Sequence, residues 1–187
     1  YMLWFQGWSS APPICKLCLE SWEYHNPEWK IHKLSVSNIT DYIPQTTFDE
    51  IMKVKSWTTR SDLVRLYLLG NHGGLWIDAT NFCNIPLDCW LKPALLVNDC
   101  WFIMDYDSKL LTFNFVYADK VPNIFTKCAT QLIGDESLYE GNFLRVIKKV
   151  DELIDNSVFD KMRKKQLVRS SNREKKGVKC ISNSDKL

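Results

Sequence analysis

The chain has 187 residues, of which 45% are hydrophobic and 25% are charged. A chain of this length can bury one sizeable core but is too short for two ordinary domains, and the composition excludes a largely disordered chain. No apolar run is long enough to cross a bilayer, so no transmembrane segment is predicted. The formal net charge is +2, with basic residues gathered near the C-terminus rather than across the sequence, which argues against a nucleic-acid partner.

The first 35 residues have the pattern of a strand, a helix and a second strand. Residues 1–5 form a short apolar run that predicts a buried strand, and Gln6-Gly7 ends it. Pro12 and Pro13 suit a helix start, and Asn26-Pro27 ends the helical spacing of apolar residues. Residues 29–33 alternate as the next strand. This order predicts a βαβ unit with parallel strands.

Two helices and a strand are predicted in the middle of the chain. Thr47 and Glu50 have capping-box spacing and predict a short helix to about residue 55. Ser61 or Asp62 caps a longer helix, which ends in the glycines of residues 70–74. Residues 75–78 then form a short apolar strand that ends in an acid.

The second half predicts a strand pair followed by helices. Residues 100–104 form an apolar strand that ends in the acids Asp105 and Asp107, and residues 110–116 pair back on it across the polar turn at residues 107–109. The predicted fold class is α/β, with one mixed, mostly parallel sheet and helices on both faces. Helices are expected at 123–133, 141–154 and 158–167. All of these elements belong to a single predicted domain over 1–171, and a basic tail follows at 172–187.

Ligands of open α/β sheets bind outside the carboxyl ends of the strands, which directs attention to the residues that follow each strand. Asp78 ends one strand, and Asp62 and Arg65 share a face of the preceding helix. A nucleoside diphosphate leaves readily when a divalent cation bridges its phosphates to a carboxylate. Asp78 can supply that carboxylate, and the Thr80 hydroxyl can assist. A surface ion pair and an ordinary strand-end acid are the simpler interpretations of the same residues.

The motifs together resemble the capsular polysaccharide synthesis glycosyltransferases. The similarity rests on Trp-Phe-Gln-Gly at 4–7, Ser-Asp-x-x-Arg at 61–65, Gly-Gly-Leu-Trp-Ile-Asp-Ala-Thr at 73–80 and Pro-Leu-Asp-Cys-Trp-Leu at 86–91. It covers about half of the chain in register, and it extends to related families that carry a Ser-Asp-x-x-Arg helix before a DxD motif.

The resemblance implies a GT-A fold, a UDP-sugar donor, a glycan or glycoprotein acceptor, and Mn²⁺ or Mg²⁺. Trp4 would flank the uracil, Gln6 and Gly7 would line the nucleotide, and Asp62 and Arg65 would hold the donor sugar. The nucleotide site would also include Asp78, Ala79 and Thr80, with Asp78 and Thr80 as the metal-binding pair. Thr80 replaces the last acid of the DxD motif, so one carboxylate is absent and the remaining metal ligands are unassigned.

The mechanism stays open at the level of sequence. An inverting transfer needs a general base near the acceptor hydroxyl, for which Asp105 and Asp107 are the candidates. An acid-rich hairpin turn explains these two residues equally well, and a retaining transfer needs no such base.

Two other functions compete with a sugar transferase. The missing DxD carboxylate and the compact length also suit a catalytically inactive nucleotide-binding or sugar-binding module of a larger protein. A third hypothesis is a nucleic-acid-associated protein that uses the basic tail. The seven cysteines are typical of a reducing compartment and predict a cytoplasmic location, the host cytoplasm for a large-virus enzyme.

Overall fold

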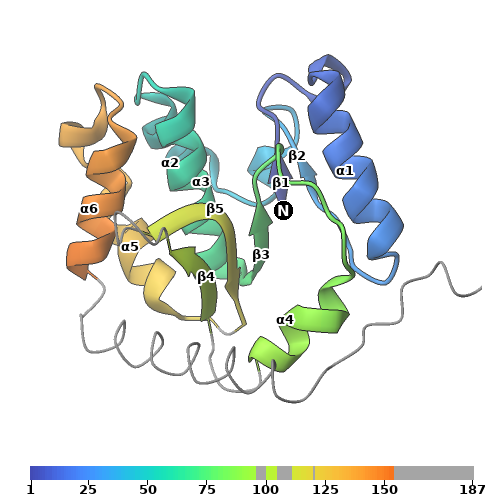
Figure 1. Ribbon diagram of the computed structural model, residues 1–187. Helices are drawn as coiled ribbons and strands as arrows, with labels where there is room; N and C mark the ends of the chain where they lie inside the picture. Colours follow the sequence, from blue (N-terminus) through green and yellow to red (C-terminus); the bar gives the residue numbers. More distant parts are fainter. Residues whose placement is uncertain (96–99, 105–110, 120, 154–187) are drawn as a thin grey trace, which may run out of the picture.

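The computed structural model describes residues 1–95, 100–104, 111–119 and 121–153 (Figure 1). The helix predicted at 158–167, the tail at 172–187 and the boundary at 171 lie outside the described residues. The strands are β1 (Met2–Leu3), β2 (Lys33–Leu34), β3 (Gly74–Ile77), β4 (Cys100–Met104) and β5 (Leu111–Ala118). The α-helices are α1 (Pro13–His25), α2 (Gln45–Met52), α3 (Trp57–His72), α4 (Leu87–Leu95), α5 (Ile124–Leu132) and α6 (Phe143–Leu153).

The strands form a mixed arrangement in which β5 alone of the described strands runs against the others. β1 pairs parallel with β2, whereas β5 pairs antiparallel with both β3 and β4. The backbone nitrogen of Tyr1 donates to the Leu75 carbonyl at 2.6 Å, and the Ile77 nitrogen donates to the Tyr1 carbonyl at 3.0 Å. These two bonds have the parallel pattern and join β1 to β3. The α/β class with a mixed, mostly parallel sheet is therefore confirmed.

One face of the sheet is covered by α2, α3, α5 and α6 (Figure 1). Leu3, Leu34, Trp76 and Val116 point from the strands into this core, and each is buried. Side chains alternate between the faces of a strand, so the neighbours of these residues point the other way. This larger core gives the described part of the molecule most of its apolar burial.

The opposite face is covered by α1 and α4 (Figure 1). Met2, Leu75, Ile77 and Phe115 contribute to this second core from the strands. Together the two cores define three layers, helices on a sheet on helices, as the alternating pattern of the strands predicts. None of the helices in the described ranges has the length and apolar character needed to span a bilayer.

Several predicted boundaries were wrong, and β1 and α2 end at Leu3 and Met52 rather than at residue 5 and about residue 55. The long helix α3 begins at Trp57, not near Ser61, because the Ser56 hydroxyl accepts a hydrogen bond from the Thr59 nitrogen at 3.3 Å and caps the helix earlier. Helix α2 begins directly after Pro44, two residues before the Thr47 start that the capping-box spacing suggested. Strand β2 covers Lys33–Leu34 rather than residues 29–33.

Helix α3 and helix α5 approach each other closely at Gly70. A Cβ placed on Gly70 would lie 2.6 Å from the Thr126 nitrogen and 2.7 Å from the Phe125 carbonyl carbon. The Asn123 side chain caps α5 and also donates to the Leu69 carbonyl at 2.8 Å. The Thr126 hydroxyl donates to the Gly70 carbonyl. Glycine is therefore required here by the approach of the two backbones and not by its own dihedral angles.

We expect Gly70→Ala to destabilise the protein by about 2 kcal/mol, because contacts of 2.6–2.8 Å with backbone atoms put the overpacking cost near the upper end of roughly 1–3 kcal/mol, and alanine recovers up to about 1 kcal/mol in helix propensity. The measurement is the free energy of unfolding in urea. Asn71→Ala is the control, since residue 71 is exposed on the same helix. Equal stability of Gly70→Ala and the wild type would contradict the close contact.

Candidate functional site

A cavity of about 490 Å³ lies at the carboxyl ends of β1 and β3. Because these two strands run in the same direction, Trp4 and Asp78 follow them at the same edge of the sheet. Helix α3 closes another side of the cavity. The lining residues are Leu3, Trp4, Phe5, Gln6, Trp57, Thr58, Ser61, Arg65, Trp76, Asp78, Ala79 and Thr80. Six of the eight residues predicted for the nucleotide site, all except Gly7 and Asp62, are therefore brought together.

Arg65 is the central charge of the site and is only 4% exposed. Its Nη2 donates to Asp78 Oδ1 at 2.8 Å, and its Nη1 lies 3.3 Å from Asp62 Oδ1. The guanidinium carbon lies 4.9 Å from the centre of the Trp76 ring, within the range of a cation–π contact. Arg65 is thus held between two carboxylates and one aromatic ring.

Asp78 has one oxygen engaged and one available. Arg65 and the Trp76 indole nitrogen, the latter at 2.7 Å, both donate to Oδ1. Among the described residues, Oδ2 accepts no hydrogen bond, and 35% of the side chain is exposed at the cavity. The indole and guanidinium therefore orient the carboxylate and leave an anionic oxygen for a ligand.

Asp62 lies behind the site instead of in it. It is 6% exposed and does not line the cavity, and its contact is the ion pair with Arg65. Burial raises the pKa of the Asp62 carboxyl to about 6; nearby Asp78 also raises this pKa, and Arg65 opposes the shift. In this structure Asp62 forms an ion pair with Arg65 and does not line the cavity. The predicted direct contact of Asp62 with a donor sugar would therefore need a local rearrangement of the residues around it.

Gly7 shapes the entry to the cavity without lining it. Its φ of 91° lies in the left-handed region, and its nitrogen donates to the Trp4 carbonyl at 2.9 Å. This turn places the exposed Gln6 side chain at the cavity and starts a short 3-10 helix at Trp8–Ser10. The glycine thus acts through the backbone geometry of the loop after β1.

The sequence prediction missed Trp57 and Thr58, and it treated Ser61 as a helix cap and as part of the Ser-Asp-x-x-Arg motif without assigning it to the ligand site. Trp57, Ser61 and Arg65 are spaced by four residues, which puts them on one face of α3, toward the cavity. Trp57 is 47% exposed, and its ring lies 5.0 Å from the Phe5 ring. The Ser56 cap is the signal that would have extended the helix back to Trp57 and revealed this face.

Asn114 adds a polar group beside Asp78. Strand β5 runs antiparallel to β3 with Ile77 opposite Phe115, so Asp78 and Asn114 are the next opposed pair and share a sheet face. The Asn114 carbonyl accepts hydrogen bonds from the Asp78 nitrogen at 2.8 Å and from the Asn81 side chain at 2.9 Å. Its side chain is exposed at this edge of the sheet.

The described residues contain no group of three or more His, Cys, Asp or Glu side chains arranged to hold a metal ion. The site presents one carboxylate oxygen of Asp78 and the exposed hydroxyl residue Thr80. A cation that takes most of its ligands from a diphosphate and water fits this donor set. Asp105 and Asp107, the predicted general bases, lie outside the described residues.

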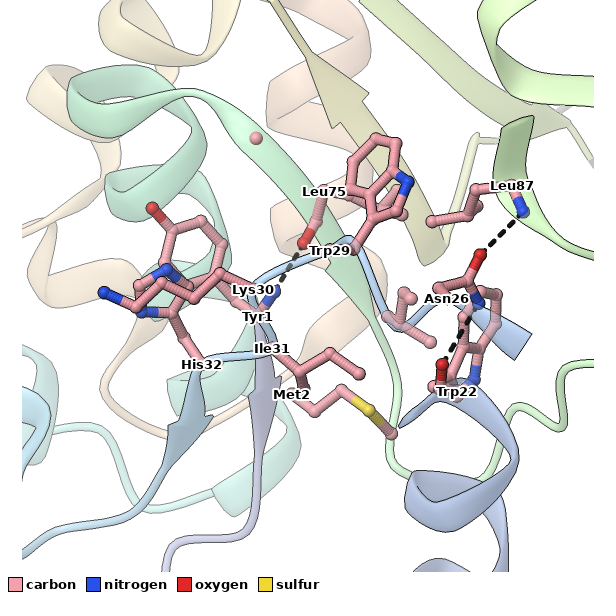
Figure 2. Close-up of a pocket in the computed structure, with 12 residues that line it drawn as sticks. Tyr1, Met2, Trp22, Asn26, Trp29, Lys30, Ile31, His32, Leu75 and Leu87 are labelled. Atoms are coloured by element: carbon pink, nitrogen blue, oxygen red, sulfur yellow. Dashed lines mark hydrogen bonds between the residues drawn. The ribbon is translucent and has the colours of Figure 1, made fainter. Parts of the chain in front are cut away.

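A second cavity, of about 140 Å³, contains none of the predicted site residues. Figure 2 shows its lining, which comes from the start of β1, the carboxyl end of α1, the segment before β2, strand β3 and the first residue of α4. Asn26 is part of this lining and is hydrogen-bonded to the backbone of Trp22 and Leu87.

Three comparisons relate the chain to known proteins. A family model described as capsular polysaccharide synthesis protein matches residues 1–133. The O-glycosyltransferase braB of Annulohypoxylon truncatum is 29% identical over an alignment of 106 residues, and the match covers 49% of this chain and 25% of that protein. The chain thus spans about a quarter of the length of this curated relative.

Among solved structures, the PaToxG glycosyltransferase superposes with a TM-score of 0.60 over 99% of this chain and 80% of that one. The sequence identity of the pair is 14%, so this likeness concerns the fold alone. It confirms the expectation of a GT-A-like fold.

We expect the stability of Asp62→Asn relative to the wild type to increase as pH rises. The pKa of Asp62 is raised from 3.8 to about 6 in the folded state, so its protonated form contributes stability below pH 4 that is lost by about pH 7. The difference in free energy of unfolding between variant and wild type should change by about 3 kcal/mol over this interval, at about 1.4 kcal/mol per pKa unit.

Urea unfolding at a series of pH values measures this difference. Groups shared by both proteins cancel, and Asp41→Asn, an exposed site, serves as the control. A difference that is constant between pH 4 and pH 7 would show that Asp62 titrates as it does in the unfolded chain.

Proposed function

The chain belongs to the capsular polysaccharide synthesis protein family, and we propose that it is a glycosyltransferase that uses a UDP-sugar donor. The acceptor would be a glycan or glycoprotein, and Mn²⁺ or Mg²⁺ would assist. One observation carries the proposal: Asp78 is oriented through Oδ1 by Arg65 and Trp76, and its other oxygen is available at a cavity of about 490 Å³.

The charges at the cavity favour a cation-assisted reaction. Arg65 is the only basic residue in the lining given above, and Asp78 and the buried Asp62 more than balance it. A leaving diphosphate therefore gains little positive charge from the described residues. Asp78 Oδ2 and the Thr80 hydroxyl would hold a divalent cation, which would neutralise charge on the diphosphate.

The aromatic residues of the cavity suit a nucleoside. Trp4 and Trp57 both line it, and a base stacks favourably on an indole. Gln6 supplies an amide that can donate and accept, and Ser61 supplies a hydroxyl from the same helix face as Arg65. We assign the nucleoside to this aromatic part and the diphosphate and sugar to the part near Arg65 and Asp78.

The chemical step depends on residues at the acceptor side. In an inverting transfer, Asp105 or Asp107 would remove the proton of the acceptor hydroxyl as its oxygen bonds to the sugar, while the bond from the sugar to the diphosphate breaks and UDP leaves. In a retaining transfer, neither residue is needed as a base. Arg65 contributes to both routes, because it fixes Asp78 and offers donors to hydroxyl or phosphate oxygens.

An inactive nucleotide-binding module is the second candidate. The cavity lining contains one carboxylate, that of Asp78, and Thr80 stands where a DxD motif has its last acid. Such a module would bind UDP without releasing sugar from a UDP-sugar. Release of sugar in the presence of Mn²⁺ distinguishes the enzyme from the module.

We further propose a cytoplasmic location. Among the cysteines that the structure describes, Cys15, Cys18, Cys83 and Cys128 are buried free thiols, as is typical of proteins in a reducing compartment.

We expect UDP binding to require Mn²⁺ and to weaken by about tenfold or more in Asp78→Asn, since each loss of about 1.4 kcal/mol is tenfold in affinity. Titration calorimetry with and without Mn²⁺ is the measurement. Asp41→Asn changes an exposed carboxylate elsewhere and should bind as the wild type does. Mn²⁺-dependent binding that survives in Asp78→Asn would remove Asp78 from the cation site.

We expect Trp57→Ala to weaken UDP binding about tenfold in Mn²⁺, because stacking on a base contributes roughly 1–3 kcal/mol. Inorganic pyrophosphate has no base, so its affinity should stay at the wild-type value. Tyr24→Ala is the control, since Tyr24 is an exposed aromatic residue outside the cavity. Equal losses for UDP and pyrophosphate would contradict the assignment of Trp57 to the nucleoside.

A further inference from the structure

The segment that follows Asp78 is tied to the carboxyl end of α1. The Trp22 indole nitrogen donates to the Asn81 carbonyl at 2.7 Å, and the Ser21 hydroxyl accepts from the Cys83 nitrogen at 2.9 Å. Ser21, Trp22 and Cys83 are buried. These bonds join residues about 60 positions apart in sequence, so the helix holds two points of the loop.

Asn26 holds a third point. Its Oδ1 accepts from the Leu87 nitrogen at 2.7 Å, and its Nδ2 donates to the Trp22 carbonyl at 3.1 Å, as Figure 2 shows. The same Nδ2 lies 3.4 Å from the sulfur of Cys83. The Asn26 side chain is buried, so its amide is satisfied by these protein groups. We call Ser21, Trp22 and Asn26 the α1 clamp.

Asn81 connects the clamp to the candidate cation site. Its nitrogen donates to the Asp78 carbonyl at 3.0 Å, and its side chain donates to the Asn114 carbonyl at 2.9 Å. The Asp78 nitrogen donates to the same Asn114 carbonyl at 2.8 Å. The turn that carries Ala79 and Thr80 is therefore held from β5 on one side and from Trp22 on the other.

Helix α1 also packs against this turn directly. Ala79 is buried in a small apolar cluster with Ala11 and Cys15 of the α1 region. Thr80, the next residue, is exposed at the cavity. A buried, satisfied network of this kind restricts the backbone more than its separate bonds suggest, since each member orients the next.

We propose that the α1 clamp positions Asp78 and Thr80 for the cation, so that Ser21, Trp22 and Asn26 are positioning residues of the site. The proposal rests on the proposed function. Loss of a clamp bond frees the Asn81 carbonyl or the Cys83 nitrogen and widens the range of positions open to the turn. The outer partners of metal ligands typically change metal affinity by roughly 10–100-fold when they are removed.

The test compares Trp22→Phe with Trp29→Phe. The first substitution removes the bond to Asn81 and keeps an aromatic ring in the core. The second removes an indole bond to Asp88 at 3.1 Å, away from the turn. In a titration of Mn²⁺ at fixed UDP, we expect the midpoint of Trp22→Phe to rise roughly tenfold or more. Trp29→Phe should keep the wild-type midpoint, and a wild-type midpoint in Trp22→Phe overturns the proposal.

Ser21→Ala keeps the test decisive if Trp22→Phe does not fold. It removes the acceptor of the Cys83 nitrogen with little change in volume, and its Mn²⁺ midpoint should rise in the same way.

Hydrogen exchange of residues 79–87 without ligand gives a second readout, in which Trp22→Phe and Ser21→Ala should both exchange faster than Trp29→Phe. If the wild type binds no UDP, the proposed function fails, and the exchange result alone then decides whether the clamp exists. Exchange of residues 79–87 in Trp22→Phe and Ser21→Ala at the rate of Trp29→Phe would overturn the proposal of the α1 clamp.

Discussion

The buried guanidinium of Arg65 is the interaction on which the candidate site depends. A charge this far from water is tolerated when it is paired and hydrogen-bonded, and loss of one partner from a buried pair costs roughly 3–5 kcal/mol. Asp62 on the same helix and Asp78 at the end of β3 supply those partners. Since Arg65 and Trp76 both use one oxygen of Asp78, the other remains available at the cavity. The same bonds that satisfy Arg65 therefore orient the proposed cation ligand.

The arrangement of the strands gives this charge cluster its surroundings. β1 and β3 lie side by side in the same direction, so the residues after them, Trp4 and Asp78, share one edge. Helix α3 crosses the same edge and contributes Trp57 and Arg65 from one face. An aromatic region and a charged region thus meet in one cavity, a combination that suits a nucleotide joined to a sugar. On the other face of the sheet, α1 fixes the turn after Asp78.

Much of this could be predicted from the sequence, for physical reasons that differ by element. The apolar run before Asp78 and the helical spacing of α1 identify buried elements, and the structure confirms both. Helix α4 was not predicted, although Pro86 precedes it, because its apolar pattern is short. Trp57 was missed because the helix cap was placed at Ser61 or Asp62 instead of at Ser56. Spacing alone also could not show that Asp62 lies behind Arg65 rather than at the cavity, since both residues share one helix face.

The most direct test of the proposed site is a crystal structure of the protein with UDP and Mn²⁺, with the metal located by its anomalous scattering. We expect one manganese ion within coordinating distance of Asp78 Oδ2 and of the diphosphate, with Arg65 still bonded to Oδ1. The uracil should lie between Trp4 and Trp57. A manganese ion or nucleotide bound away from Asp78, or a cavity that remains empty at saturating UDP and Mn²⁺, would contradict the central claim.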